Sequence, residues 1–494
     1  MSAPSLLIEI GCEELPARFM QPLAQALHDG ITQGLDKAVV SRGSSQSYAT
    51  PRRVAVLIQE VATEQPEQAV ERLGPALSAA LRDGAPSPAG LGFAKSCGVD
   101  FADLEQVQTP KGEYLMFRSR SPGQAALLQT IFADTIKQMD KLVPKRMRWG
   151  AGEEAFVRPV HWICALHGSQ ALALQGWGLS SAQHSYGHRF HAPDAIKLPQ
   201  ADTYVEALRQ AKVWADVDSR RAEIARQVEA AGQARGGQAR MDADLLGEVT
   251  ALVEWPVAIS GGFEERFLDV PAEAIVLTIQ DNQRYFPVFD PEQRLLPCFV
   301  TVANIDSADA TQVVAGNERV VRPRLEDALF FWQQDLKTPL AQRLDDLARV
   351  TWAQGLGSLK DKAQRLQALC AALAPEFGLN ADAAGQAGLL AKCDLTTKMV
   401  FEMPELQGIM GGHYLRAEDP QAGDIADAVA EQYRPAGPSE RIPSTALGQL
   451  LSLADKLDTL CGYFSIGAIP TASKDPFGLR RAALGLLRIL LEGG

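Results

Sequence analysis

The sequence has 494 residues, of which 46% are hydrophobic and 22% charged, and these ordinary proportions exclude a wholly disordered chain. At roughly 100–200 residues per domain, this length corresponds to about three domains. Because 60 acidic residues outnumber 48 lysines and arginines, the net charge of -12 argues against a generally basic nucleic-acid coat protein, although a local basic groove remains compatible with it.

The ends and the cysteines indicate the setting of the protein. No secretory signal is expected, because Glu9 interrupts the apolar stretch that begins at Leu6. The apolar runs are shorter than the ~20 residues that span a bilayer, so no membrane partner is expected. The seven cysteines are scattered without a Cys-x-x-Cys spacing, which predicts neither a disulfide framework nor a cysteine zinc site and favours a reducing cytoplasm.

The first two-thirds of the chain mixes predicted helices and strands. In chain order we predict a strand at 6–10, a helix at 13–40, strands at 53–58 and 113–118, a helix at 123–142, a strand at 156–163, and helices over 201–231 with a break near 216–218. Further strands are expected at 256–260, 284–289 and 299–304. Residues 64–92 are rich in Ala, Pro, Gly and Ser and are expected to include exposed loop.

After about residue 308, nearly every window has the helical period. The predicted helical segments are 320 onward, 340–350, 358–374, 383–399, 424–432, 446–461 and 476–491. We therefore expect a multidomain fold, with an α+β region over residues 1–335, made of two or more subdomains, followed by an all-α domain over 336–494. The chain stops directly after an apolar helical run, which suggests a cropped chain, although a natural C-terminal helix fits as well.

Common catalytic motifs are missing from the sequence. It contains no Gly-x-x-x-x-Gly-Lys phosphate loop, no Gly-x-Gly-x-x-Gly, no His-Glu-x-x-His and no Gly-x-Ser-x-Gly. A P-loop ATPase, a Rossmann dehydrogenase and an α/β-hydrolase thus lose their best support, and no catalytic residue is predicted on this chain.

The densest histidine cluster is His184, His188 and His191. Their spacing would place three imidazoles on one face of a helix, but the intervening Tyr-Gly step argues against a helix, so we expect no metal site here. A contact with a polyanion through His188 and Arg189 fits better. The alternative is a structural turn with a solvated arginine.

Basic residues gather at several points of this acidic chain. They are Arg52 and Arg53; Lys145, Arg146 and Arg148; Arg158; His188 and Arg189; and Arg319, Arg322 and Arg324. Arginine forks bind phosphates bidentately, and Trp149, beside Arg148, could stack on a base or ribose, so the set favours RNA binding. Each spot taken alone is more often a solvated face or an ion-pair partner.

The helical region resembles the tail of an HD-type phosphohydrolase domain. Such a domain holds a metal through one histidine, a His-Asp pair and a distant aspartate. Here the pair is Cys393-Asp394, the distant aspartate is Asp455, and no histidine lies between His191 and His413. A catalytic divalent ion needs three or four ligands, so we expect an HD-like scaffold without a metal. Helix capping or an internal ion pair is the alternative role for the two aspartates.

Several strings are more specific than these single features. They are LIEIGCEELP at 7–16, TPRR at 50–53, RWG at 148–150, FVRPVHW at 156–162, GHRF at 187–190, EWP at 254–256, QRYF at 283–286, FEMPELQGIMG at 401–411, ADKLD at 454–458 and SKDPFGLRR at 473–481. In this order they resemble the beta subunit of bacterial glycyl-tRNA synthetase. The resemblance runs from residue 6 to the end of the chain.

The resemblance implies an α2β2 ligase that joins glycine to tRNA(Gly) at the expense of ATP. It places a class II active site, with its ATP and magnesium, on the separate alpha subunit, so that this chain holds no cofactor and supplies tRNA binding. To the basic residues above it adds Arg284, within QRYF. Beta subunits of the family continue into an anticodon-binding domain that this chain lacks, which puts its anticodon recognition in doubt.

Two other functions remain open from the sequence. One is a metal-dependent HD phosphohydrolase with an N-terminal regulatory region, and the other is an assembly scaffold that does not contact RNA. Which arginines touch RNA, where the alpha subunit docks and whether the chain is natively short are also left open.

Overall fold

The computed structural model describes residues 3–63, 70–82, 85–110, 112–119, 124–471 and 474–493. The chain forms two compact units. Unit 1 comprises Met1–Ala230, Met241–Ile259 and Val302–Ala308, and unit 2 comprises Ala231–Arg240, Ser260–Thr301 and Asp309–Gly494. Within the described ranges, no helix combines the length and the apolar character needed to cross a bilayer.

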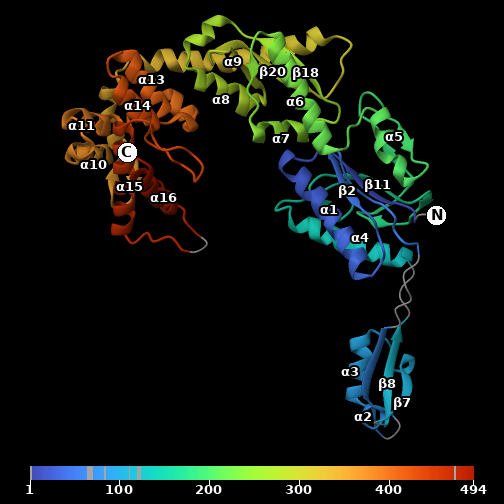
Figure 1. The fold of residues 1–494 in the computed structure, drawn as a ribbon. Helices are drawn as coiled ribbons and strands as arrows, with labels where there is room; N and C mark the ends of the chain where they lie inside the picture. The colour runs from blue at the N-terminus through green and yellow to red at the C-terminus, as the bar shows by residue number, and fades with distance from the viewer. Residues whose placement is uncertain are drawn as a thin grey trace. The chain divides into compact units, whose positions relative to one another are not determined.

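A five-stranded antiparallel sheet in the order β12-β11-β1-β3-β2 is the centre of unit 1 (Figure 1). Its strands are β1 (Leu6–Cys12), β2 (Ser45–Thr50), β3 (Arg53–Ile58), β11 (Val160–His167) and β12 (Gln170–Ala171). Every residue of β1 is buried, because β1 pairs on both edges and both faces of the sheet are covered. The predicted strands at 6–10 and 53–58 are therefore confirmed.

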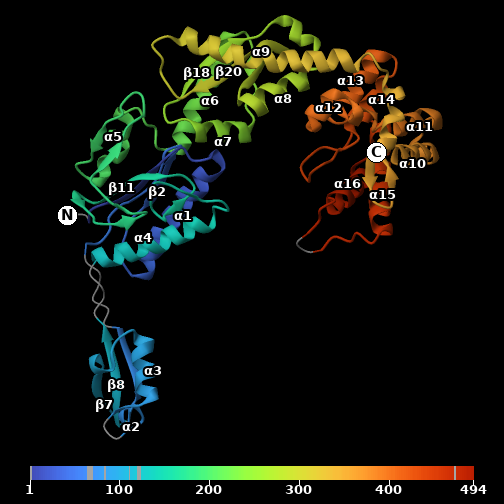
Figure 2. The same cartoon turned by 180° about the vertical axis from the view of Figure 1, so that it is seen from behind.

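Alternation along β1 separates the two faces. Ile8 and Ile10 pack with helices α1 (Ala17–Lys37) and α4 (Gln124–Lys141), which lie side by side in both views (Figures 1 and 2). Leu7 points the other way and packs with Tyr204 and Leu208 of α5 (Tyr204–Gln210). The helix predicted at 13–40 is present as α1, and its side chains at four-residue intervals from Leu23 to Leu35 are buried.

Short strand pairs and two further helices complete unit 1 around the sheet. They are β9 (Met147–Arg148) with β10 (Ala155–Phe156), β13 (Gln175–Gly176) with β14 (Leu179–Ser180), β15 (His184–Tyr186) with β16 (Ala195–Lys197), α6 (Val217–Ala234), which ends in unit 2, and α7 (Ala243–Leu252). The break predicted near 216–218 is the start of α6.

The segment from 70 to 119 has a core and a sheet of its own. Its elements are β4 (Val70–Ala76), α2 (Leu77–Ala80), β5 (Leu81–Arg82), β6 (Ala85–Pro86), α3 (Pro88–Cys97), β7 (Glu105–Thr109) and β8 (Gly112–Ser119), with the sheet order β4-β8-β7. Ala80, Ala94 and Leu115 are buried in its core. Within 64–92, where exposed loop was expected to be included, residues 70–82 and 85–92 form mainly strands and helices, and residues 64–69, 83 and 84 lie outside the described residues.

Unit 2 begins with a four-stranded sheet in the order β17-β19-β20-β18. The strands are β17 (Gln238–Ala239), β18 (Val257–Gly262), β19 (Phe286–Phe289) and β20 (Leu295–Ala303). The start of β18 and the end of β20 belong to unit 1. Helices α8 (Ala272–Gln283) and α9 (Ala310–Asp335) follow, and Phe299, Ile275 and Leu325 share the core of this unit.

The rest of unit 2 is almost wholly helical, as predicted. The helices are α10 (Leu359–Leu373), α11 (Ala381–Leu390), α12 (Lys398–Glu402), α13 (Ile409–Glu418), α14 (Gly423–Glu431), α15 (Ala446–Ser465) and α16 (Leu479–Glu492). Figure 2 shows α10, α11, α14 and α15 grouped. The all-α expectation needs one correction, a small hairpin of β21 (Thr351–Ala353) and β22 (Gly357–Ser358).

Two predicted helices in this region are wrong. Residues 340–350 form two short 3-10 helices, and 383–399 is interrupted between α11 and α12 by a 3-10 turn, Cys393–Thr396. The turn arises because the hydroxyl of Thr397 caps α12 and accepts from the backbone N–H of Val400. The domain boundary at 335–336 and the HD-like character of these helices stay predictions.

Candidate nucleic-acid interface

Three strand ends of unit 1 meet beside the segment 13–15. The backbone N–H of Glu13 donates to Pro159 O at 2.9 Å, and that of Leu15 donates to Pro51 O at 2.7 Å. These bonds fix the residues after β1 between the β2–β3 turn and the start of β11. Side chains of Arg52, Arg158 and Glu13 are thereby brought together from distant parts of the sequence.

A loop that follows β15 contributes the exposed part of this surface. Arg189 pairs with Glu13 at 2.5 Å between Nη2 and Oε2, and His161 Nε2 lies 3.0 Å from the other oxygen, Oε1. Arg158 Nε donates to Glu14 O at 3.0 Å. Phe190, next to Arg189, is 70% exposed. We use the name arginine surface for the group formed by Arg52, Arg158, Arg189, Phe190, His161 and Glu13.

The arginine surface combines features that suit RNA. Burial alone would raise the pKa of Glu13, but Arg189 and His161 outweigh burial and hold this pKa below its usual range. Glu13 is thus ionised at neutral pH and holds the guanidinium of Arg189 in place at the surface. A phosphate can compete for the same guanidinium, and the exposed ring of Phe190 can stack on a base.

Under this surface, Arg53 is fully buried and neutralised within the protein. Its guanidinium donates to Ser185 Oγ at 3.0 Å and to Tyr186 O at 2.7 Å, and it pairs with Glu254 at 3.2 Å. The second carboxylate, Glu9, lies 3.6 Å away. Burial alone would lower the pKa of Arg53, but Glu254 and Glu9 raise it above its ordinary value.

Glu9 is the anchor of this buried cluster. It accepts hydrogen bonds from Trp162 Nε1 at 2.5 Å, Ser185 Oγ at 2.6 Å and Tyr204 Oη at 2.7 Å. Strand β11, strand β15 and helix α5 are therefore joined through one carboxylate. Sequence reasoning missed Glu9 and Glu254, although a carboxylate within an apolar strand run signals a buried cation.

His188 is buried as well and supports the loop. Its Nδ1 accepts from the backbone N–H groups of Phe190 and His191 at 3.3 Å each, so Nε2 carries the proton and donates to Asn304 O at 2.7 Å. Burial lowers the pKa of His188, so the ring is neutral at pH 7. The expectation that Arg53 and His188 contact RNA directly needs correction: both position the loop that carries Arg189.

The other predicted basic residues lie elsewhere. Lys145, Arg146 and Arg148 are exposed around β9, where Arg146 pairs with Asp140 at 2.7 Å. In unit 2, Arg284 ends α8 in a left-handed conformation, and Arg319, Arg322 and Arg324 are exposed on α9. Their contact with RNA stays a prediction. The structure brings only Arg52, Arg53, Arg158, His188 and Arg189 together.

Of the three histidines of the cluster, His188 and His191 pack against each other, with ring centroids 4.8 Å apart. His184 packs its ring on Tyr186, His188 is bonded as above, and His191 accepts from the backbone N–H of Asp306 at 3.0 Å. No group of three or more His, Cys, Asp or Glu side chains with metal-binding geometry occurs in the described part of the chain.

In unit 2, the residues at the positions of the HD-type metal ligands, Cys393, Asp394 and Asp455, make contacts within the protein. Asp455 lies 3.0 Å from Lys362 Nζ and 3.2 Å from Lys392 Nζ, and Lys362 also reaches Asp458 at 3.0 Å. Burial alone would raise the pKa of Asp455, but the two ammonium groups outweigh burial and hold this pKa well below its usual range. Two cations of the protein itself thus neutralise the distant aspartate.

The pair Cys393-Asp394 is likewise accounted for within the fold. Asp394 is fully buried, and its Oδ2 accepts from the backbone N–H groups of Gly408 at 2.5 Å and Gly411 at 3.2 Å, at the start of α13. Its other oxygen has no hydrogen-bond partner, and burial raises the pKa of Asp394 to about 6. Burial also raises the pKa of Cys393 to about 12, so the thiol stays protonated.

Comparison with known proteins gives one consistent family. The sequence profile described as "Glycyl-tRNA synthetase beta subunit" matches residues 6–494. A protein of Chromohalobacter salexigens named glycine–tRNA ligase beta subunit is 49% identical over 494 residues, covering 100% of this chain and 71% of the relative. Proteins of the same name from Pseudomonas putida and Pseudomonas syringae are 47% and 48% identical, again over 100% of this chain and 71% of theirs.

Proposed function

The chain belongs to the glycyl-tRNA synthetase beta-subunit family, and from this premise we propose that its arginine surface binds tRNA(Gly) for a separate alpha subunit that carries out the chemistry. The family makes it a partner-dependent part of an aminoacyl-tRNA synthetase, a ligase of protein biosynthesis. The α2β2 stoichiometry, a cytoplasmic location, and binding of ATP, magnesium and glycine by the alpha subunit belong to the proposal.

The observation that carries the proposal is a surface held rigid from below. Arg189 and Phe190 sit on a loop whose backbone is fixed by the buried His188, and whose base is fixed by Arg53 through Tyr186 O. Preorganised arginines lose little conformational entropy when they meet phosphates, which favours a binding role over an incidental charge cluster.

The HD-type phosphohydrolase finds no support among the described residues. Its distant aspartate, Asp455, is paired with two lysines, and one oxygen of Asp394 is bonded to backbone N–H groups. The ligands that a catalytic ion needs are therefore engaged with protein groups.

The test is reconstitution. The chain is mixed with a glycyl-tRNA synthetase alpha subunit, and charging of tRNA(Gly) with labelled glycine is measured for each protein alone and for the mixture. Charging is expected only in the mixture, and glycine-dependent pyrophosphate–ATP exchange is expected from no preparation of this chain alone. Exchange by the isolated chain would overturn the assignment of catalysis to the partner.

A further inference from the structure

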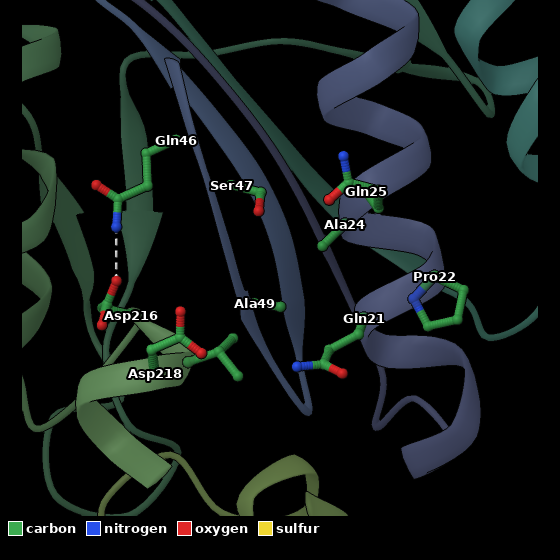
Figure 3. A pocket seen from close by; sticks show the side chains of 10 residues that line it. Gln21, Pro22, Ala24, Gln25, Gln46, Ser47, Ala49, Asp216 and Asp218 are labelled. Carbon is green, nitrogen blue, oxygen red and sulfur yellow. Dashed lines mark hydrogen bonds between the residues drawn. The ribbon is translucent and has the colours of Figure 1, made fainter. Parts of the chain in front are cut away.

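Unit 1 contains a second feature, away from the buried cluster. A cavity of about 530 Å³ opens between α1, the edge strand β2 and the start of α6 (Figure 3). Its polar lining comes from Gln21 and Gln25 of α1, Gln46 and Ser47 of β2, and Asp216 and Asp218 at the start of α6. None of the residues that line this cavity belongs to the arginine surface.

One wall of the cavity is an open sheet edge. β2 is the last strand of its sheet, and Ala49 N–H donates outside the sheet, to Ala215 O at 3.1 Å. Since backbone groups alternate in direction along a strand, the N–H and C=O of Ser47 point to the same open side. Among the described residues, no backbone hydrogen bond from outside the sheet reaches Ser47. Such an edge is a template for another strand.

The negative charge of the cavity favours a basic ligand. Figure 3 shows Asp216 and Asp218 near each other, across the cavity from the α1 residues, and Asp216 accepts from Gln46 Nε2 at 2.6 Å. Two carboxylates repel a phosphate backbone and attract an ammonium or guanidinium group. The side-chain amides of Gln21 and Gln25 can bond to an extended peptide backbone. The cavity therefore suits a peptide better than RNA.

We propose that an extended segment of the alpha subunit, carrying a lysine or arginine, adds to β2 as a sixth strand and places that side chain between Asp216 and Asp218. The proposal rests on the proposed function, because it takes the alpha subunit as the partner. Backbone hydrogen bonds to Ser47 supply affinity, and the two aspartates supply selection for a basic side chain.

A pair of substitutions at one position tests the edge. Ser47→Pro removes the outward N–H without touching the β2–β3 ladder, whereas Ser47→Ala keeps the backbone and removes only the hydroxyl. We expect Ser47→Ala to bind the alpha subunit like the wild type and Ser47→Pro to weaken assembly at least tenfold, measured by titration with labelled alpha subunit. Equal affinity of the two variants would overturn the proposal.

A second measurement needs no variant. Hydrogen exchange of the peptide containing 45–50 is compared in the wild-type chain with and without the alpha subunit, and slower exchange is expected only in the complex. If exchange is unchanged although the complex forms and charges tRNA, this proposal fails while the proposed function stands. If Ser47→Pro weakens tRNA binding but not assembly, the occupant is RNA and the proposal is overturned. If the wild type neither assembles nor charges tRNA, the proposed function fails first.

Discussion

The two units contain buried charge clusters of opposite design. In unit 1 a cation, Arg53, lies between two carboxylates, Glu9 and Glu254. In unit 2 a carboxylate, Asp455, lies between two ammonium groups, Lys362 and Lys392. The first cluster sits under an exposed loop and fixes it, whereas the second neutralises a position that resembles a metal site. A buried charge cluster can therefore hold a surface loop in place, as in unit 1, or neutralise a buried aspartate, as in unit 2.

Removing the central cation of unit 1 is expected to have the largest effect. Arg53→Met leaves Glu9 and Glu254 buried without a counter-charge, so the free energy of unfolding should fall by about 3–5 kcal/mol. Urea unfolding followed by circular dichroism measures this loss. Arg53→Lys retains the charge but cannot donate to both Tyr186 O and Glu254, and should lose about 1–3 kcal/mol. A stable Arg53→Met protein would contradict the role of this cluster.

Removing the central anion of unit 2 should cost less. Asp455→Asn leaves Lys392 without its carboxylate, but Lys362 keeps Asp458, so we expect a loss of about 2–3 kcal/mol. The pKa of Asp455 is lowered in the folded state, so its stabilisation is present above the unfolded pKa of about 4 and is lost as the pH falls below it. The difference between the two proteins should be constant from pH 5 to 8 and shrink in acid, by urea unfolding at each pH.

The contribution of Asp394 to stability should depend on pH in the opposite direction to that of Asp455. Its pKa is raised to about 6, so the folded state binds a proton that the unfolded state releases near pH 4, and stability falls as the pH rises between these values. Asp394→Asn removes this titration and can still accept from Gly408 and Gly411. Relative to the wild type, the variant should gain on the order of 1–3 kcal/mol between pH 4 and pH 8. A difference that does not change with pH would show that Asp394 is ionised throughout.

The surface above the unit 1 cluster should affect binding and leave stability unchanged. Arg189→Gln is expected to weaken tRNA binding by about 2- to 10-fold and to reduce the slope of log affinity against log salt by about one. Arg226→Gln is the matched control, because Arg226 is exposed and pairs with Glu223 as Arg189 pairs with Glu13. Filter binding over a salt series measures both. Equal effects of the two variants would remove the arginine surface from the interface.

The smallest effect is expected from divalent metals. With Asp455 held by lysines, Mn²⁺ should shift the unfolding temperature of the wild type by less than about 1 °C, because a ligand stabilises only the state that it binds. Elemental analysis of the purified protein is the second measurement. Near-stoichiometric Mn, Fe or Zn that disappears in Asp455→Ala would revive the phosphohydrolase alternative.

Parts of the fold were predictable because one physical signal dominates them. The apolar run of β1 and the four-residue period of α1 predicted both elements, and the helical period predicted most of the second half. In the segment from 70 to 119 the strand predicted at 113–118 is confirmed as β8, whereas the other strands and helices were not predicted, since they are short and rich in small residues. The interruption at 393–396 was not predicted, since the Thr397 cap of α12 is accompanied there by hydrogen bonds of Asp394 to residues that are 14 or more positions away.

The sequence predicted which basic residues are candidates for the site, but it did not predict which of them lie together at the surface. The sequence analysis named both Arg52 and Arg53 as candidate RNA contacts. Neighbouring residues at a strand end point to different sides, so only the fold shows that Arg53 is buried. Glu13 was not predicted to belong to the site, because the sequence alone does not show which cation it pairs with. Its role depends on a pairing across 176 positions of the chain.

The order of strands in the central sheet has a consequence for synthesis on the ribosome. β1 leaves the ribosome first and can pair with β3 soon afterwards, but its other edge waits for β11, about 150 residues later. At 5–20 residues per second, this delay is roughly ten to thirty seconds. During that time one edge of a mostly apolar strand has no partner, which is the situation in which nascent chains aggregate or recruit chaperones. Production of this protein should therefore depend on elongation rate more than its final stability suggests.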